Sequence, residues 1–233
     1  MKSTLKAFKY SFKLVNPLLA TALLILLFIC SSNPILSAVK RIAEYRSNPD
    51  EYRFDFVSTH LLESSLFSLL TVWGFMVCIN MLIGNCKFSY SVSFARKLHT
   101  IVPVIYAFIP VMMLFTITVF ITAIELGSKA FSAVFIAGSI CYSVTGIAGS
   151  VGYRIRRYAG INYILIMISF MSVVIYDDVI MKLSISAPAV IVLSYIILAA
   201  GFVFSCWYMN HLWDKGVRFI KHKHGFESLL GNK

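Results

Sequence analysis

The sequence predicts an all-α integral membrane protein, in which six transmembrane helices follow a short amphipathic helix on the membrane surface. Two observations predict this fold. Hydrophobic residues make up 59% of the 233 residues and charged residues only 13%, which is far from the balance of a soluble globular domain. Six uncharged runs, each 19 to 31 residues long, reach the length of about 20 residues that a helix needs to cross a bilayer.

The surface helix is expected at residues 1–13. Its lysines recur at every third or fourth position, and the apolar side chains Leu5, Phe8 and Phe12 fall on an adjacent helical stripe. Such a helix lies on the membrane with its apolar side in the lipid. The alternative is the charged start of a cleavable signal peptide, but no small-residue cleavage site closes the apolar run that follows.

The six runs form one transmembrane domain over residues 14–213, which a basic tail follows at 214–233. The runs occupy residues 14–39, 64–86, 100–124, 130–153, 158–176 and 183–213. They must be helices, because a membrane-spanning segment has to satisfy its own backbone hydrogen bonds and the alternation typical of barrel strands is missing.

Basic residues in the connections predict the orientation. The amino terminus, the second connection, the fourth connection and the tail hold 15 of the 21 Lys and Arg residues. The other three connections hold the remaining 6 together with most of the acids. Because positive charge accumulates on the cytosolic side, both termini are expected to be cytosolic. Anionic lipids are expected partners of these charges, whereas a scattered basic pattern without a soluble face argues against nucleic acid.

The second connection is the segment most typical of a protein contact. Its charges, Lys87, Arg96 and Lys97, are the only ones between Glu63 and Glu125. We expect four apolar or aromatic side chains to anchor in a partner's groove while the basic pair faces an acidic rim; the anchors are Phe88, Tyr90, Val92 and Phe94. The alternative is a solvated turn whose aromatic rings lie among lipid headgroups.

Small residues four apart mark the fourth run as a close-packing helix. The set is Ser139, Ser143, Gly146, Gly149 and Gly152. Small side chains let helix backbones approach closely, so this face is expected to pack within the subunit or against another subunit. A substrate path along the same face is the alternative.

The sequence lacks the motifs of several classes of transporter and enzyme. No Asp, Glu, Lys or Arg lies deep in a run, which disfavours an ion-coupled carrier. A Gly-x-x-x-x-Gly-Lys phosphate loop is absent, so any nucleotide must be hydrolysed by another subunit. Neither a Gly-x-Ser-x-Gly elbow nor a His-Glu-x-x-His pair occurs. Cys86 and His99 remain as a thiol and imidazole pair that a cysteine protease would need.

Together these features resemble the permease subunit of the type 2 ABC transporter family, in the small form found in bacterial gene clusters for peptide and antimicrobial export or immunity. Such permeases often carry a Phe- and Ser-containing stretch that ends in Ser-Arg-Lys before the third span. Here the stretch Ser93-Phe-Ala-Arg-Lys97 has the basic pair separated from the serine.

The resemblance implies a bacterial plasma-membrane protein that is not itself an enzyme and binds no cofactor directly. It implies an ABC ATPase as the partner that holds ATP, bound through residues 88–97, and a second permease copy or a related permease. Two other classes stay open. One is a non-transporting six-span immunity or regulatory protein, and the other is a membrane-embedded enzyme acting on lipid or peptide.

Overall fold

The computed structural model describes residues 2–14, 86–125, 127, 131–151 and 185–215, with single residues and short pieces at 25, 32, 36, 39–40, 42–44, 46–47, 69, 73–74, 76–80, 82–84 and 166–168. Across these residues the chain is helical and has no strand. The elements are α1 (Lys2–Leu14), the 3-10 helix η1 (Lys87–Tyr90), α4 (Ala95–Glu125), α5 (Ala133–Val151) and α7 (Ala187–Asp214).

Helices α4, α5 and α7 are each long and apolar enough to cross a membrane. They correspond to the expected spans at 100–124, 130–153 and 183–213. The other three expected spans, at 14–39, 64–86 and 158–176, are described only in single residues and short pieces. The count of six therefore stays a prediction.

The ends of these helices follow local sequence signals. Helix α4 begins at Ala95, earlier than the apolar run predicts, because Arg96 and Lys97 continue the helix beyond the hydrophobic core. After its carboxyl end, Gly127 adopts a φ of 77° and donates its N–H to the Thr122 carbonyl at 3.1 Å, a left-handed stop that suits glycine. Helix α7 follows Ser186 and has a proline in its first turn.

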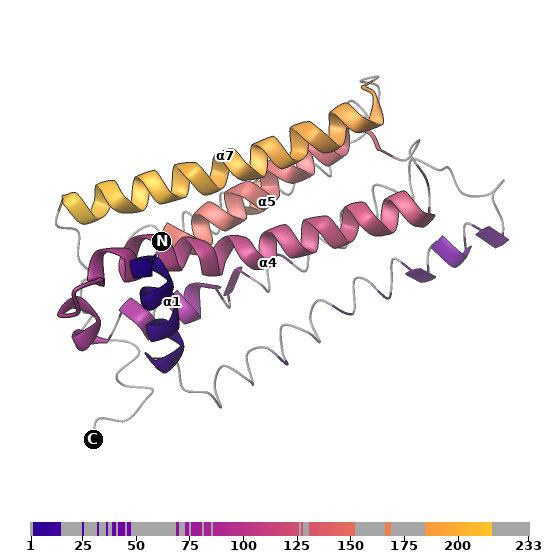
Figure 1. The fold of residues 1–233 in the computed structure, drawn as a ribbon. Coiled ribbons are helices and arrows are strands. Elements are labelled where there is room, and N and C mark those ends of the chain that lie inside the picture. Colours follow the sequence, from indigo (N-terminus) through magenta and orange to yellow (C-terminus); the bar gives the residue numbers. More distant parts are fainter. Residues whose placement is uncertain are drawn as a thin grey trace.

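The three long helices run side by side, and each packs against the other two (Figure 1). Phe115, Phe135 and Tyr142 are fully buried between them, with Phe115 and Tyr142 edge to face at 5.3 Å between ring centroids. The opposite face of α7 exposes large apolar residues, among them Ile196, Val203 and Trp207. An apolar core on one side and an apolar exposed surface on the other are typical of a helix in lipid.

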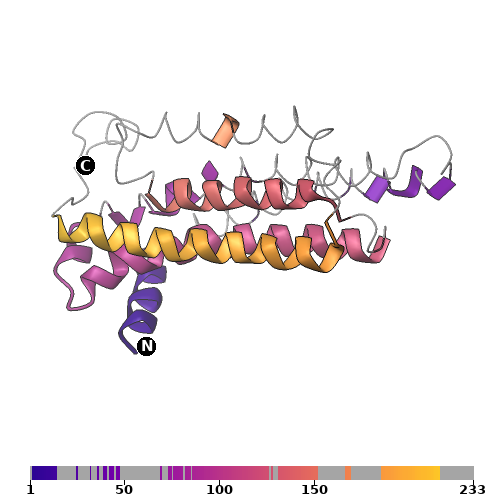
Figure 2. The same ribbon diagram turned by 90° about the horizontal axis from the view of Figure 1, so that it is seen from above.

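Helix α1 lies across the beginning of α4 instead of along the bundle (Figures 1 and 2). A second, smaller core holds it there, made of Ala7, Ile83, Leu98 and Val102 with partly buried side chains around them. The outward side of α1 carries Leu5, Lys6, Lys9 and Lys13, all exposed. The expected amphipathic segment is thus present as a helix, and its position on a membrane surface stays a prediction.

Candidate functional site

The segment that joins the second expected span to α4, residues 86–97, is folded, and we call it the connecting segment. Its backbone is closed by local hydrogen bonds from Ser89 N–H to the Cys86 carbonyl at 3.0 Å and from Ala95 N–H to the Val92 carbonyl at 2.9 Å. Residues 87–90 form η1, residues 91–94 form a bend, and α4 begins at Ala95. The segment expected from sequence as a turn is therefore a short 3-10 helix and a bend that lead into the first turn of α4.

A buried polar contact fixes η1 to α4. The Ser89 hydroxyl lies 2.6 Å from the Cys86 carbonyl oxygen and 2.8 Å from Nε2 of His99, and both Ser89 and His99 are fully buried. When the hydroxyl donates to the carbonyl, it accepts the Nε2–H of His99. The imidazole expected as a possible partner of Cys86 is thus bonded to Ser89 and acts as a structural tie.

Three aromatic rings stack over this contact. The Tyr90 ring lies 4.0 Å from the His99 ring, centroid to centroid, with 14° between their planes. Trp213, near the end of α7, is nearly parallel to both rings, at 6.2 Å from Tyr90 and 5.6 Å from His99. Tyr90, expected to face a partner, therefore joins η1 to α4 and α7 within the chain.

Two further expected anchors contact α1. Phe94 meets Tyr10 edge to face, with 5.4 Å between ring centroids, and Val92 and Phe94 both pack against the small core below α1. Deeper in the same contact, Tyr106 of α4 stacks on Phe8 at 5.4 Å and its hydroxyl lies 2.9 Å from the Ser11 hydroxyl. Helix α1 and the connecting segment therefore form one packed unit at this end of α4.

The basic pair is also engaged within the chain. The Arg96 guanidinium lies 3.0 Å from the Asp214 carboxylate and donates to the Asn210 side-chain oxygen at 3.3 Å. Lys97 donates to the Ser3 hydroxyl at 2.6 Å. Arg96 thus ties the connecting segment to the end of α7, and Lys97 ties it to the start of α1.

The surface left to a partner differs from the surface the sequence predicts. Tyr90, Val92, Phe94 and Lys97 are only partly exposed, whereas Ser91, Ser93 and Arg96 are exposed. The side chain of Phe88 lies outside the described residues, although its backbone belongs to η1. Docking through this segment stays a prediction, and the surface left for it among the described residues is the exposed side of the bend and of the first turn of α4.

The partners Tyr10, Asn210, Trp213 and Asp214 were not anticipated from sequence, since nothing in their spacing links them to the connecting segment. One signal was available for Asp214. It is the acid that directly follows the last apolar run, on the side of the membrane expected to be basic.

The small residues of α5 face α4, α7 and the piece of chain that holds Met76. A Cβ added at Gly146 would lie 2.8 Å from the Phe108 ring of α4, and one added at Gly149 would lie 2.9 Å from the Met76 sulfur. On another side of α5, Ser143 fits against Gly201 of α7, where an added Cβ would overlap the serine hydroxyl.

The remaining members of the small-residue set are described in part. Ser139 is fully buried, and its hydroxyl donates to the Ile136 carbonyl at 2.7 Å. Gly152 lies outside the described residues. The described small residues are thus used inside the chain, between α5 and its neighbours.

An amide bridges the helices beside this contact. Asn80 is fully buried, and its side-chain nitrogen donates to the Gly149 carbonyl at 3.0 Å and to the Pro103 carbonyl at 3.4 Å. It ties α4 to α5 close to the connecting segment. Side-chain amides that hydrogen-bond to a neighbouring helix are one of the contacts that join helices in membranes.

Comparison of the chain with protein-family models, with curated proteins and with solved structures found no match. The function must therefore be inferred from these contacts and from the sequence.

Proposed function

We propose that the chain is the transmembrane subunit of an ATP-driven transporter of the type 2 ABC class. In this proposal it lies in a bacterial plasma membrane with six spans and both termini cytosolic, and it pairs with a second permease. A separate ATPase docks on the connecting segment and supplies the energy. The substrate class that suits the resemblance is a peptide, an antimicrobial or a lipid-like molecule.

The observation that carries the proposal is the tying together of the connecting segment, α1 and α7. A soluble motor can drive membrane helices only if its docking surface is mechanically joined to them. Tyr90 reaches α7 through Trp213, and Arg96 reaches it through Asp214. Displacement of the segment would therefore be passed to the end of a helix that is long and apolar enough to span the membrane.

The charges around the segment suit this role. Lys6, Lys9 and Lys13 are exposed on the outward side of α1, where they would meet anionic headgroups if α1 lies on the cytosolic surface. Arg96 keeps about half of its side chain exposed, 55%, beside Asp214, so it can also contact an acidic rim on a partner and influence partner choice.

The test is purification of the tagged chain from its native membranes in mild detergent. The proposal predicts that a soluble subunit with a Gly-x-x-x-x-Gly-Lys-Ser/Thr loop is retained and that the complex, returned to lipid, hydrolyses ATP. If no phosphate-loop protein is retained, even after chemical crosslinking in intact cells, the transporter assignment is wrong. A non-transporting immunity protein or a membrane-embedded enzyme then takes its place.

A further inference from the structure

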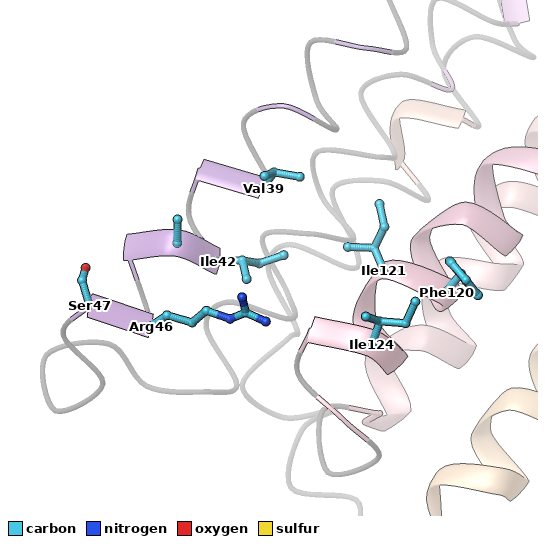
Figure 3. A pocket seen from close by; sticks show the side chains of 8 residues that line it. Val39, Ile42, Arg46, Ser47, Phe120, Ile121 and Ile124 are labelled. Atoms are coloured by element: carbon cyan, nitrogen blue, oxygen red, sulfur yellow. The ribbon is translucent and has the colours of Figure 1, made fainter.

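A cavity lies at the end of α4 opposite the connecting segment. Its volume is about 590 Å³, within the range of about 300–1,000 Å³ common for small-molecule sites. One wall is the last two turns of α4, and the other is made of described residues between positions 39 and 47 (Figure 3). The lining residues are Val39, Ile42, Ala43, Arg46, Ser47, Phe120, Ile121 and Ile124.

The lining combines apolar walls with one cation. Among the lining residues, Ile42 is 3% exposed, whereas Phe120 and Ile124 are 64% and 60% exposed. In Figure 3 the Arg46 side chain points from its own segment toward Ile124, while Ser47 points away from α4. None of the described lining residues carries a carboxylate, so the described walls offer a ligand apolar surface and a guanidinium.

The opening continues as an apolar stripe down α4. Ile109, Met113, Ile117, Phe120 and Ile124 are all exposed and follow one another at steps of three or four residues, which places them on one helix face. From Ile109 to Ile124 the helix rises by about 22 Å. Half of a bilayer's hydrocarbon core is about 15 Å thick, so the stripe is long enough to lie along an acyl chain through one leaflet.

We propose that this cavity binds one anionic phospholipid, with its phosphate on Arg46 and an acyl chain along the α4 stripe. Arg46 also takes part in an interaction within the chain, and its five N–H donors allow a phosphate to be held in addition. A free phosphate would contact Arg46 but would leave the apolar lining uncovered. A phospholipid would contact both, so it is the ligand proposed. The proposal requires a membrane protein but no transport activity, and it concerns the membrane boundary opposite the proposed ATPase contact.

The experiment is native mass spectrometry of the purified chain in detergent, titrated with dioleoyl phosphatidylglycerol or with dioleoyl phosphatidylcholine. The unaltered chain is expected to bind the first phosphatidylglycerol more tightly than the first phosphatidylcholine. Equal binding of the two lipids would overturn the proposal without any variant, so the result does not depend on whether a variant folds. Dihexanoyl phosphatidylglycerol, with the same headgroup and short chains, should bind more weakly than the dioleoyl form, and equal binding would remove the role of the stripe.

Substitutions at Arg46 and at a cation outside the lining then test where the lipid binds. Arg46→Gln should weaken the tightest phosphatidylglycerol site by about tenfold or more, because a charge-assisted contact is lost, and Arg46→Lys should recover part of it. The matched control is Lys40→Gln, which removes an exposed cation from the same piece of chain but not from the lining. If Lys40→Gln weakens binding as much as Arg46→Gln, the lipid is held by general charge attraction and the site is not the one proposed.

Discussion

Arg96, in the first turn of α4, forms an ion pair with Asp214, the last residue of α7, with 3.0 Å between Nη2 and Oδ2. The two side chains are 55% and 57% exposed. Exposed pairs contribute only about 0.2–1 kcal/mol to stability, because solvent and salt screen them. The pair is therefore too weak to hold the fold and is better suited to setting how the connecting segment moves with α7.

The first prediction separates these two roles. Arg96→Gln and Asp214→Asn should each change the stability of the chain by less than about 1 kcal/mol, and the double variant should add no further loss. If the proposed ATPase complex exists, both single variants should lower the coupling of ATP hydrolysis to transport. Thermal melts in detergent measure the stability, and turnover in proteoliposomes measures the coupling. A large loss of stability with unchanged coupling would show that the ion pair holds the fold and does not couple the segment to α7.

The second prediction concerns the contact of α5 with α4. Gly146→Leu should destabilise the chain by about 1–3 kcal/mol, as overpacking does, because the Phe108 ring already lies 2.8 Å from an added Cβ. Gly149→Leu should destabilise the chain as well, because an added Cβ would lie 2.9 Å from the sulfur and 3.3 Å from the Cβ of Met76, a buried side chain.

The control for both is Gly74→Leu, because an added Cβ at Gly74 meets nothing within 4 Å. Heating followed by size-exclusion chromatography in detergent gives the ranking. Combining Gly146→Leu with Phe108→Ala should recover part of the loss. Should Gly74→Leu prove as harmful as Gly146→Leu, close packing at the α5 face is not the cause.

The apolar runs predicted the three described long helices because an uncharged stretch of this length has few stable conformations other than a helix that spans a membrane. They did not predict where α4 begins. Hydropathy locates the lipid core, whereas Ala95, Arg96 and Lys97 continue the helix into the polar region at the membrane edge.

The inner contacts of the site could not be read from sequence for a different reason. Arg96 and Asp214 are separated by 118 positions, and only the packing of α4 against α7 brings them together. Phe94 was expected to face outward because an aromatic residue beside a basic pair suits an interface. In the folded chain Tyr10 of α1 meets it first, and a spacing pattern carries no signal for such a pairing.

The third prediction tests orientation. In a chain whose five cysteines are replaced, Ser47→Cys and Ser93→Cys place single thiols at exposed positions at opposite ends of α4. A membrane-impermeant maleimide applied to intact cells should label the first and not the second, following the 15 of 21 basic residues assigned to the inside. Labelling of Ser93→Cys alone would invert the topology, and labelling of both after lysis confirms that each thiol can react.

The docking of an ATPase on the connecting segment is tested most directly at Ser93, which is exposed at the bend. Ser93→Trp adds bulk to the outer surface and should leave the inner contacts of Tyr90, Phe94 and Arg96 intact. Its control is Ala123→Trp, which adds the same bulk at an exposed position near the opposite end of α4, outside the cavity lining. Measured as ATPase retained per tagged chain and as ATP turnover of the reconstituted complex, Ser93→Trp should lose at least about tenfold in affinity, while Ala123→Trp should equal the parent. Unchanged retention and turnover in a correctly folded Ser93→Trp chain would contradict docking at this segment.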